Sequence, residues 1–585
     1  MATATNVNTA DRYVGTIVGE STSREFRLAV AHETVREQDI IAVDAELRRP
    51  EDEAAPPEKL RVWAKVQRIE RLNPLFPSEA GHELAATRTD PFDTVLSLSR
   101  EMVTAVCQVL GAEPLDGSVG GKLDHLRYPA QPATSAYRPD SRDIARVVLG
   151  ELQQKQKRAL DIATLSNRPE VDVKIDGHAI VTRHLAILAM TGAGKSWTAR
   201  RIIEQLAAKN YPIVIFDPHG DYTGLADVPG LKKQVRRYYA QFPIFEQAPE
   251  TVMTVVETLG WNLANTHRNW FDDLFKGAQS CISGTTEELK QRARWFADFL
   301  GNNNITRFGL QPNLFFMADF VQAVVLAGKS QNQDAIDQLV EWSGRDALGN
   351  INKQQAGWLE GLPNNLRTAA RQIWQMERIS KQIARDSQPL PIDRTELVNY
   401  GGVSIVALAG YTSDFQATIY TLVAEQIFSA RVSDELKLPV LLLLEEAHNF
   451  APARASTAAE QRAVATTRQI AQEGRKFGVG LILISQRPSR LDETTLSQCN
   501  SYIIMRMVNP ADQSYVRRVI ETLGEDEANL LPDLDVGEAL LSGQLINFPV
   551  LVRIKEPQSK GEREEKDAFE ALEEARLDLA NERRR

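Results

Sequence analysis

Apolar and polar positions follow two different periods along this chain, and the change between them predicts its organisation. In residues 11–75, apolar and polar positions alternate in short β-branched segments such as YVGTIVG, EFRLAV, DIIAVDAEL and LRVWAKVQRI. Turn residues and an acidic, proline-containing run at 48–57 separate these segments. Strands at this spacing predict a small β-barrel, completed by pieces of residues 100–150 such as MVTAVCQVLG and LDHLRYP. Because no catalytic constellation occurs here, we interpret this region as an oligomerisation or docking module.

From residue 184 the pattern changes to buried strands that alternate with helices. A connector at 141–183 precedes it, in which we expect a helix at 141–156 and strands at VDVKID and HAIVTR. Strands alternating with helices predict a mostly parallel sheet covered on both faces, hence an α/β fold. The expected strands are LAILA (185–189), PIVIFD (212–217), GGVSIVALAG (401–410), PVLLLLEE (439–446), VGLILISQ (479–486), SYIIMRM (501–507) and LINFPVLVRI (545–554).

Between about 250 and 395 the strand pattern disappears. Amphipathic periodicity at 283–301, 317–325, 334–343 and 365–385 predicts helices, which we interpret as a helical insertion in the α/β domain. The tail at 556–585 reads as a charged helix with a weak apolar stripe that could lie on a neighbouring molecule. The predicted parts are therefore the barrel at 1–145, two core segments at 146–250 and 396–555, the insertion at 251–395, and the extension at 556–585.

The segment HLAILAMTGAGKSWT (184–198) combines a buried strand, a glycine turn, Lys-Ser and a helix that runs to Ala207. This order is typical of a phosphate-binding P-loop, because glycines let backbone N–H groups converge on an anion at a helix N-terminus. Ala189 replaces the first glycine of the usual pattern. Lys195 can reach the β- and γ-phosphates of ATP, and Ser196 can bind Mg²⁺. The expected nucleotide-binding residues are Thr191, Gly192, Ala193, Gly194, Lys195, Ser196 and Trp197.

A second buried strand, PVLLLLEEAHNF, ends in two adjacent carboxylates. In P-loop enzymes, side chains at this position bind Mg²⁺ and orient the attacking water. We expect Glu445 to hold Mg²⁺ and Glu446 to polarise the water; the alternative is a solvated loop after a strand. Asp217 and Asp221 in FDPHGDY also follow a strand, and either orient water or Mg²⁺ or only shape a turn. His219 reads as a loop histidine.

Two further polar residues extend this constellation. Gln486 ends the strand VGLILISQ, where an amide can sense the γ-phosphate. Arg475 lies at the end of the preceding predicted helix, in EGRKFG. A guanidinium there can stabilise a phosphoryl transition state from a neighbouring subunit. An ordinary helix C-terminus, with basic residues facing the dipole and Gly478 ending the helix, explains Arg475 equally well.

Composition restricts the class of protein. The 585 residues suggest two to four domains, and 43% hydrophobic with 25% charged residues is typical of a globular protein. Three scattered cysteines give neither a disulfide framework nor a zinc site. No secretory signal or membrane span is evident, so we expect a cytoplasmic protein. The net charge of −10 argues against a generally basic surface but not against a local basic channel for nucleic acid.

Taken together, RHLAILAMTGAGKSWT, FDPHGDY, LLLLEEAH and EGRKFGVGLILISQRP, with the barrel before them, resemble the HerA family in the FtsK–HerA branch of P-loop proteins. The resemblance implies a RecA-like ATPase core behind a HAS-type barrel. It places Lys195 and Ser196 on the Walker A residues, Glu445 and Glu446 on the Walker B pair, Gln486 on the sensor and Arg475 on the trans-acting arginine. Many members have Asp-Glu at the acidic pair, so Glu445 favours water-mediated contact with Mg²⁺.

The resemblance also implies a homohexameric ring with DNA in its central channel. It implies a nuclease of the NurA type, or a sirtuin-like or other nuclease effector, docked on the barrel, in DNA end processing, repair or antiviral defence. Our candidate DNA contact is the loop at 449–462, with Arg454 and Arg462; a mobile surface loop is the alternative. The sequence presents no aromatic stacking platform or helix-turn-helix, so base-specific readout is not expected.

These observations predict an ATP- and Mg²⁺-dependent DNA translocase or helicase. The main alternative is a scaffold ring that binds ATP in order to assemble and activate a nuclease or NADase effector, with translocation incidental. A conjugative coupling or chromosome-segregation pump is a third reading, which the lack of predicted membrane spans disfavours.

Overall fold

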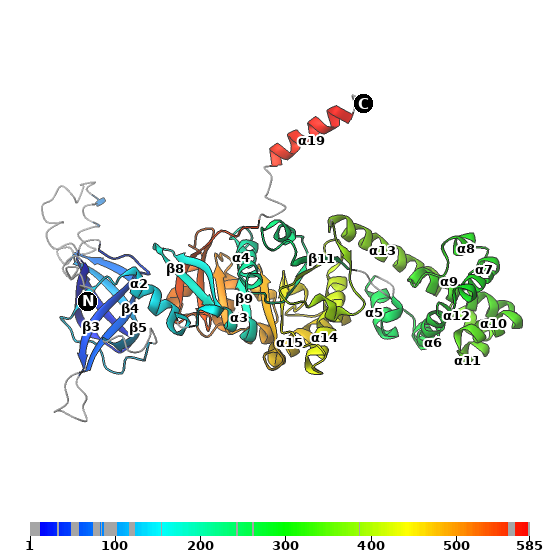
Figure 1. The fold of residues 1–585 in the computed structure, drawn as a ribbon, viewed down its shortest axis with the longest axis horizontal. Coiled ribbons are helices and arrows are strands. Elements are labelled where there is room, and N and C mark those ends of the chain that lie inside the picture. Colours follow the sequence, from blue (N-terminus) through cyan, green and yellow to red (C-terminus); the bar gives the residue numbers. More distant parts are fainter. Residues whose placement is uncertain are drawn as a thin grey trace. The chain divides into compact units, whose positions relative to one another are not determined.

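The computed structural model describes residues 12–31, 34–47, 58–73, 82, 85–86, 102–115, 123–153, 155–240, 244–259, 263–384, 386–559 and 568–582. The acidic run at 48–57 lies outside these ranges. The chain forms two compact units, which are described one at a time below (Figure 1). The first comprises residues 1–209, 480–489 and 496–558, and the second comprises 210–479, 490–495 and 559–585.

The first unit begins with a closed antiparallel barrel, drawn in blue in Figure 1. Its strand order is β1-β2-β5-β4-β3-β6, with β6 pairing back to β1. Val14, Phe26, Val43, Val62 and Cys107 point inward and belong to one buried cluster, as the alternating sequence requires. The strands are β1 Tyr13–Ser21, β2 Glu25–Val30, β3 Ile40–Leu47, β4 Glu58–Leu72, β5 Met102–Pro114 and β6 Ser135–Tyr137.

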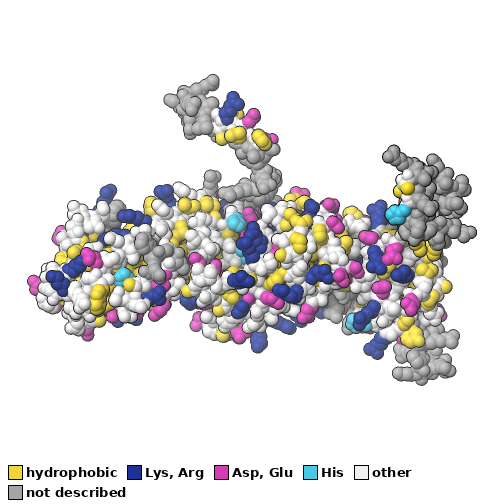
Figure 2. All heavy atoms as spheres, turned by 180° about the vertical axis from the view of Figure 1, so that it is seen from behind, with side chains coloured by type: hydrophobic (Ala, Val, Ile, Leu, Met, Phe, Trp, Pro, Cys, Tyr) yellow, Lys and Arg dark blue, Asp and Glu magenta, His cyan; other side chains and the backbone are white. Residues whose placement is uncertain are grey.

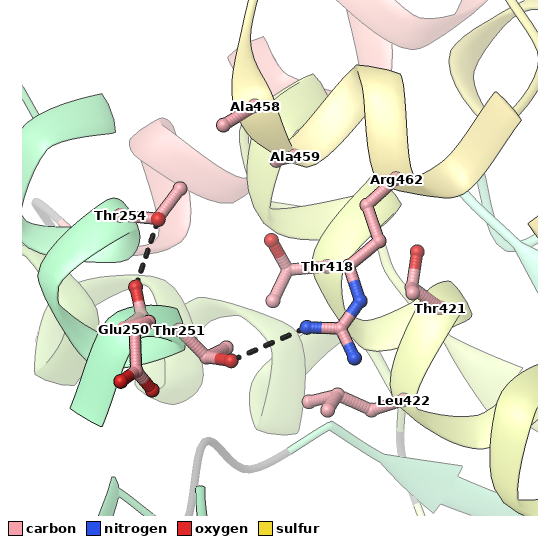
Figure 3. Close-up of a pocket in the computed structure, with 9 residues that line it drawn as sticks. All are labelled: Glu250, Thr251, Thr254, Thr418, Thr421, Leu422, Ala458, Ala459 and Arg462. Carbon is pink, nitrogen blue, oxygen red and sulfur yellow. Dashed lines mark hydrogen bonds between the residues drawn. The ribbon is translucent and has the colours of Figure 1, made fainter. Parts of the chain in front are cut away.

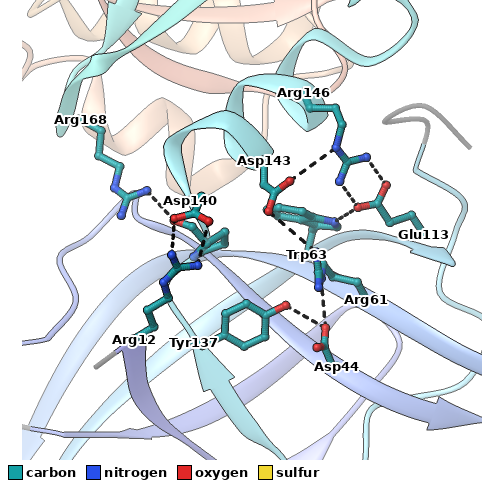
Figure 4. A network of polar contacts seen from close by, with 11 residues as sticks. Arg12, Asp44, Arg61, Trp63, Glu113, Tyr137, Asp140, Asp143, Arg146 and Arg168 are labelled. Atoms are coloured by element: carbon teal, nitrogen blue, oxygen red, sulfur yellow. Dashed lines mark hydrogen bonds and ion pairs between the residues drawn. The ribbon is translucent and has the colours of Figure 1, made fainter. Parts of the chain in front are cut away.

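A polar network joins the barrel to helix α2 (Ser141–Leu149) (Figure 4). Buried Glu113 accepts two hydrogen bonds of 2.6 Å from Arg146 and one of 3.0 Å from the indole nitrogen of Trp63. A second connection is an ion pair of 2.7 Å between Lys65 of β4 and Glu527 of helix α18 (Glu525–Leu530), with side chains 2% and 5% exposed. The barrel is therefore fixed to the rest of its unit by satisfied buried charges.

The sheet of the first unit has the strand order β15-β9-β16-β17-β18-β7-β8. The strands β15, β9 and β16 are parallel, and the remaining neighbours pair antiparallel. Helix α4 (Lys195–Ala207) follows β9, and helix α17 (Pro510–Val519) follows β16. The strands are β7 Ala159–Leu165, β8 Arg168–Asp176, β9 Leu185–Leu188, β15 Val479–Ser485, β16 Ser501–Met505, β17 Glu538–Gly543 and β18 Val550–Ile554.

The second unit contains a parallel sheet with the order β12-β11-β13-β10-β14. Strands β10 (Ile213–Asp217), β13 (Val403–Ala407) and β14 (Val440–Leu444) are buried along their whole length, as expected of parallel strands covered on both faces. Strand β12 (Gln388–Pro389) lies at one edge of this order and pairs with β11 (Val235–Tyr239), which lies between β12 and β13. Helices α14 (Ser413–Val432) and α15 (Ala458–Phe477) pack against each other.

Helices occupy the chain between β11 and β12, drawn in green in Figure 1. The longest, α13, packs on α9, and its residues Leu366, Ala370 and Ile373 are buried. At the far end of α13, Ile379 and Ser380 meet the loop after β13, where Ser380 donates a hydrogen bond to the carbonyl of Ala407. The helices are α5 Pro249–Thr258, α6 Asn265–Cys281, α7 Thr286–Leu300, α8 Asn303–Phe308, α9 Leu314–Ser330, α10 Gln333–Ser343, α11 Asp346–Gly349, α12 Lys353–Trp358 and α13 Leu362–Ile383.

The predicted α/β class with a separate barrel is confirmed, but two local predictions are wrong. The segment HAIVTR is helix α3 (Gly177–Arg183), because Asp176 caps it by accepting a hydrogen bond from the His178 backbone N–H. The barrel is closed by β6 rather than by LDHLRYP, in which Asp124 makes only an isolated bridge to Ala112. Strands β7, β11, β12 and β17 were not expected from the hydrophobic pattern.

The described residues add four further observations. On the face drawn in Figure 2, basic and acidic side chains are interspersed rather than separated by sign. Cys107, Cys281 and Cys499 are free and buried, and burial raises the pKa of Cys107 to about 12. Within the described ranges, no helix has the length and apolar content needed to cross a bilayer. In the C-terminal helix α19 (Ala568–Glu582), Phe569 and Leu572 of the weak apolar stripe are exposed.

Candidate functional site

Hydrogen bonds to the ends of the two neighbouring strands, β15 and β16, hold the start of the glycine turn after β9. All four residues of β9 are buried between β15 and β16. The N–H of Ala189 donates to the carbonyl of Ser485 (3.2 Å), and that of Met190 donates to Arg506 (3.0 Å). Ala189 is fully buried, so an alanine fits where the usual pattern has glycine. These contacts fix the position of the turn at the carboxyl end of β9.

The turn has the conformation that an anion-binding cradle needs. Gly192 and Gly194 have φ angles of +81° and +103°, which disfavour any residue with a Cβ. A Cβ on Gly194 would also lie 3.1 Å from the terminal methyl group of Met505. Lys195 and Ser196 are half-buried at the first positions of α4, a helix of 13 residues whose N-terminus favours negative charge. A nucleotide triphosphate fits this donor set.

Gln486 is brought directly to the turn. The hydroxyl of Thr191 donates a hydrogen bond of 2.5 Å to the side-chain carbonyl of Gln486, which follows β15. On the other side of the turn, the indole of Trp197 donates to the carbonyl of Lys555 (3.2 Å) and is 38% exposed. The predicted nucleotide-binding residues and Gln486 thus lie together in one unit.

The two carboxylates after β14 belong to the second unit and are almost fully buried. Glu445 and Glu446 have exposures of 0% and 3%. The hydroxyl of Tyr222 donates a hydrogen bond to Glu445. Burial and the charge of Glu445 raise the pKa of Tyr222 well above its usual range, so it remains a donor. The reading of Glu445 and Glu446 as a solvated loop is wrong.

Glu446 has left-handed backbone angles (φ 50°, ψ 54°), which non-glycine residues seldom adopt. Such strain persists where the surroundings impose it, and it is frequent at functional sites. The Nδ1 atom of His448 lies 3.3 Å from the Glu446 carboxylate, and Asn449 donates through its backbone to the Glu446 carbonyl (2.8 Å). The side-chain amide of Asn449 also donates a hydrogen bond of 3.2 Å to the side-chain oxygen of Gln416. The amide nitrogen of Gln416 donates in turn to the carbonyls of Leu408 and Tyr411.

Asp217 shapes the loop that presents Tyr222. Its carboxylate accepts hydrogen bonds from the backbone N–H groups of His219, Gly220, Asp221 and Tyr222, at 2.8 to 3.3 Å. Burial, with the charge of Asp221 second, raises the pKa of Asp217. Of the two sequence interpretations of Asp217, the structure therefore favours the turn. Tyr222 was missed because a tyrosine after an Asp-containing turn carries no motif of its own.

Arg475 and Lys476 are exposed in the last turn of α15. Gly478 ends that helix with φ 70°, and its N–H donates to the carbonyl of Gly474. The predicted C-terminal cap is therefore present. It leaves the Arg475 side chain at the surface.

The two candidate DNA-contacting arginines differ. Arg462 pairs with Glu425 through bonds of 2.7 and 3.1 Å and lies within 3.4 Å of the Thr251 hydroxyl. It lines a cavity of about 150 Å³ between α5, α14 and α15 (Figure 3). The hydrogen bonds to Glu425 raise the pKa of Arg462. Arg454 is exposed, on a loop anchored by the bond from Ala453 to the Arg490 carbonyl (2.7 Å).

Comparison with known proteins finds sequence similarity to HerA helicases. Residues 160–427 match the family described as "Helicase HerA, central domain". The DNA double-strand break repair helicase HerA of Pyrococcus furiosus is 28% identical over 535 residues, covering 84% of this chain and 85% of that protein. The HerA of Sulfurisphaera tokodaii is 29% identical over 398 residues, covering 67% and 68%. The structure of VirB4 of Thermoanaerobacter pseudethanolicus aligns with 14% identity and a TM-score of 0.42, covering 68% of this chain and 96% of its own.

Proposed function

As the chain is an ATP-hydrolysing enzyme whose resemblance to the HerA family is confirmed, we propose that it is a DNA translocase or helicase driven by ATP. The observation that carries the proposal is the cradle after β9, where two left-handed glycines, the N-terminus of α4, Lys195 and the Thr191–Gln486 contact lie together. The HerA relatives named as DNA double-strand break repair helicases support DNA as the polymer on which it acts.

The proposed roles follow the chemistry of each side chain. Lys195 neutralises the β- and γ-phosphates, and Glu446 orients and polarises the attacking water. The hard oxygen donors Ser196 and Glu445 suit Mg²⁺, which supplies Lewis-acid stabilisation of phosphate charge. Tyr222 holds the Glu445 carboxylate in place. Gln486 senses the γ-phosphate beside Thr191.

We also propose a homohexameric ring, DNA in its channel and a cytoplasmic location, together with the five-part division of the chain. The exposed Arg475 acts on the nucleotide of the neighbouring subunit, which requires such a ring. The barrel receives a nuclease or other effector, and the biological setting is DNA end processing or antiviral defence. Arg454 and Arg462 both remain proposed DNA contacts because both side chains are exposed, although Arg462 also pairs with Glu425.

The test is the ATPase rate with and without linear duplex DNA. We expect DNA to raise the rate of the wild type, and Lys195→Ala to abolish hydrolysis. The exposed Lys209 near the end of α4 provides a matched control, since Lys209→Ala should behave as the wild type. An ATPase rate indifferent to DNA would overturn the proposal.

A second candidate is a scaffold ring in which ATP assembles and activates an effector. The buried attachment of the barrel through Lys65 and Glu527 favours it, since a rigidly held barrel suits a docking platform. Glu446→Gln separates the two candidates. A translocase loses effector-coupled DNA processing together with hydrolysis, whereas a scaffold keeps effector activation.

A further inference from the structure

Helix α13 exposes a basic and aromatic stripe beside the face that packs on α9. Arg371, Trp374, Arg378 and Lys381 are all exposed, and Trp374 is 53% exposed. Their spacing of three, four and three residues places them on one helix face. The stripe extends over about 15 Å, at 1.5 Å per residue. The buried face of α13 packs on α9.

A cavity of about 800 Å³ adjoins the stripe and is lined by both Arg371 and Trp374. A second cavity of about 370 Å³ shares the wall formed by Gln311, Asn313, Phe315 and Trp374. The lining of the larger cavity therefore combines aromatic rings, guanidinium groups and several side-chain amides. The amides are those of Asn302, Asn304, Gln311 and Asn313.

Several of these groups are held in fixed orientations. Arg367 donates to Asp319 at 2.9 Å and to Gln322 at 3.4 Å. The side-chain oxygen of Asn313 caps α9 by accepting from the Phe316 N–H (3.1 Å). Asn302 caps α8 in the same way, accepting from the Asn304 N–H at 3.2 Å. A preformed set of donors and acceptors binds a ligand with a smaller loss of side-chain entropy.

The ring of Trp374 also lies beside a cation. The guanidinium carbon of Arg378 is 5.3 Å from the Trp374 ring centroid, and Lys381 is placed in the same way over Tyr239, at 5.4 Å. Tyr239 is buried, so Trp374 supplies the exposed ring of this group. An exposed aromatic ring among basic side chains is a surface that proteins use for unpaired nucleotides, with a base stacking on the ring and phosphates contacting the cations.

We propose that the stripe of α13 and its cavity bind single-stranded DNA, with a base on Trp374 and phosphates on Arg371 and Arg378. This inference rests on the proposed function only in taking DNA as the polymer. It departs from the sequence-based expectation that the chain has no stacking platform. A duplex hides its base faces and so cannot use Trp374, which makes the unpaired strand the favoured ligand.

The experiment measures binding of a fluorescent single-stranded oligonucleotide to the full-length, nucleotide-free protein by anisotropy, over a range of salt concentrations. Trp374→Ala should weaken binding about tenfold, since stacking is worth about 1–3 kcal/mol per base and 1.4 kcal/mol is tenfold. The Arg371→Ala/Arg378→Ala variant should reduce the slope of log affinity against log salt by about 1.4, or about 0.7 for each phosphate contact.

Matched controls come from the same group of helices. Trp358 is 46% exposed at the end of α12, and Arg294 is exposed on α7; neither lines the cavity. Trp358→Ala and Arg294→Ala should bind the strand as the wild type does. Melting temperatures of all variants should agree, so that a loss of binding reports the site and not the fold.

Unchanged strand binding by both the Trp374 and the arginine variants would overturn the inference. So would competition by free deoxyadenosine monophosphate as strong as that by the strand, or equal Trp374 dependence for a blunt duplex. Stimulation of the ATPase by duplex DNA is measured on the same samples. If that stimulation is absent while strand binding still depends on Trp374, the proposed function fails and the inference stands.

Discussion

The hydroxyl of Thr191 donates a hydrogen bond of 2.5 Å to the side-chain carbonyl of Gln486. This contact joins the first residue of the glycine turn to the tip of the neighbouring strand. A change at the phosphates can therefore reach the loop after Gln486 through one hydrogen bond.

Gln486→Ala should uncouple hydrolysis from binding. We expect kcat to fall by about tenfold or more, with nucleotide affinity nearly unchanged, because a positioned polar group at a phosphoryl-transfer site acts mainly in the transition state. Steady-state ATPase kinetics beside equilibrium nucleotide binding provide the measurement. Thr191→Val, which removes only the donor, should show a smaller loss. Equal kcat in Gln486→Ala and wild type would contradict the sensor role.

Tyr222→Phe should weaken catalysis through Glu445. The substitution deletes one hydroxyl and leaves a buried carboxylate without that donor. We expect kcat to fall about tenfold, since losing a hydrogen bond to a charged group costs about 1.5–3 kcal/mol. Titration of ATPase activity with Mg²⁺ should require a higher metal concentration than the wild type. Tyr420→Phe is a matched control, because the buried Tyr420 hydroxyl bonds Thr467 rather than a carboxylate.

Substitutions at the buried pair of Lys65 and Glu527 should have non-additive effects on the free energy of unfolding. Lys65→Met leaves Glu527 buried without its partner, which should cost about 3–5 kcal/mol. Adding Glu527→Leu to Lys65→Met should recover much of that loss, because two buried charges are then removed together. Urea unfolding of the wild type, the single variants and the double variant measures the coupling. Additive losses would show that the pair does not attach the barrel as described.

Substitution of Arg462 should mainly affect stability, whereas substitution of Arg454 should mainly affect DNA binding. Arg462→Ala removes the partner of Glu425 and should lower the melting temperature, with a small effect on the salt dependence of DNA binding. Arg454→Ala should leave the melting temperature unchanged and reduce the salt slope for duplex DNA by about 0.9, as one phosphate contact predicts. The opposite assignment of effects would make Arg462 the main DNA contact of the two.

The sequence predicts those parts of the site that depend on local order along the chain. The buried run before the glycine turn, the start of α4 and the acidic end of β14 all follow from strand burial and glycine geometry. The contact of Tyr222 with Glu445 could not be predicted, because it joins residues 223 positions apart through a turn that Asp217 organises.

The partners of charged side chains could not be predicted for a related reason. Arg462 reads as a free basic residue in the sequence, and only the packing of α14 against α15 gives it Glu425 as a partner. Lys65 likewise alternates as a polar position in a strand, but lies buried against α18. Charge in a sequence carries no information on the residue that neutralises it.

The most direct test of the account is displacement of a third DNA strand from a triplex placed at the end of a long duplex. The account predicts displacement with ATP, and none with a non-hydrolysable analogue, with Lys195→Ala or with Glu446→Gln. If the protein hydrolyses ATP on this duplex and the third strand remains bound, the enzyme does not translocate, and the scaffold function replaces the one proposed here.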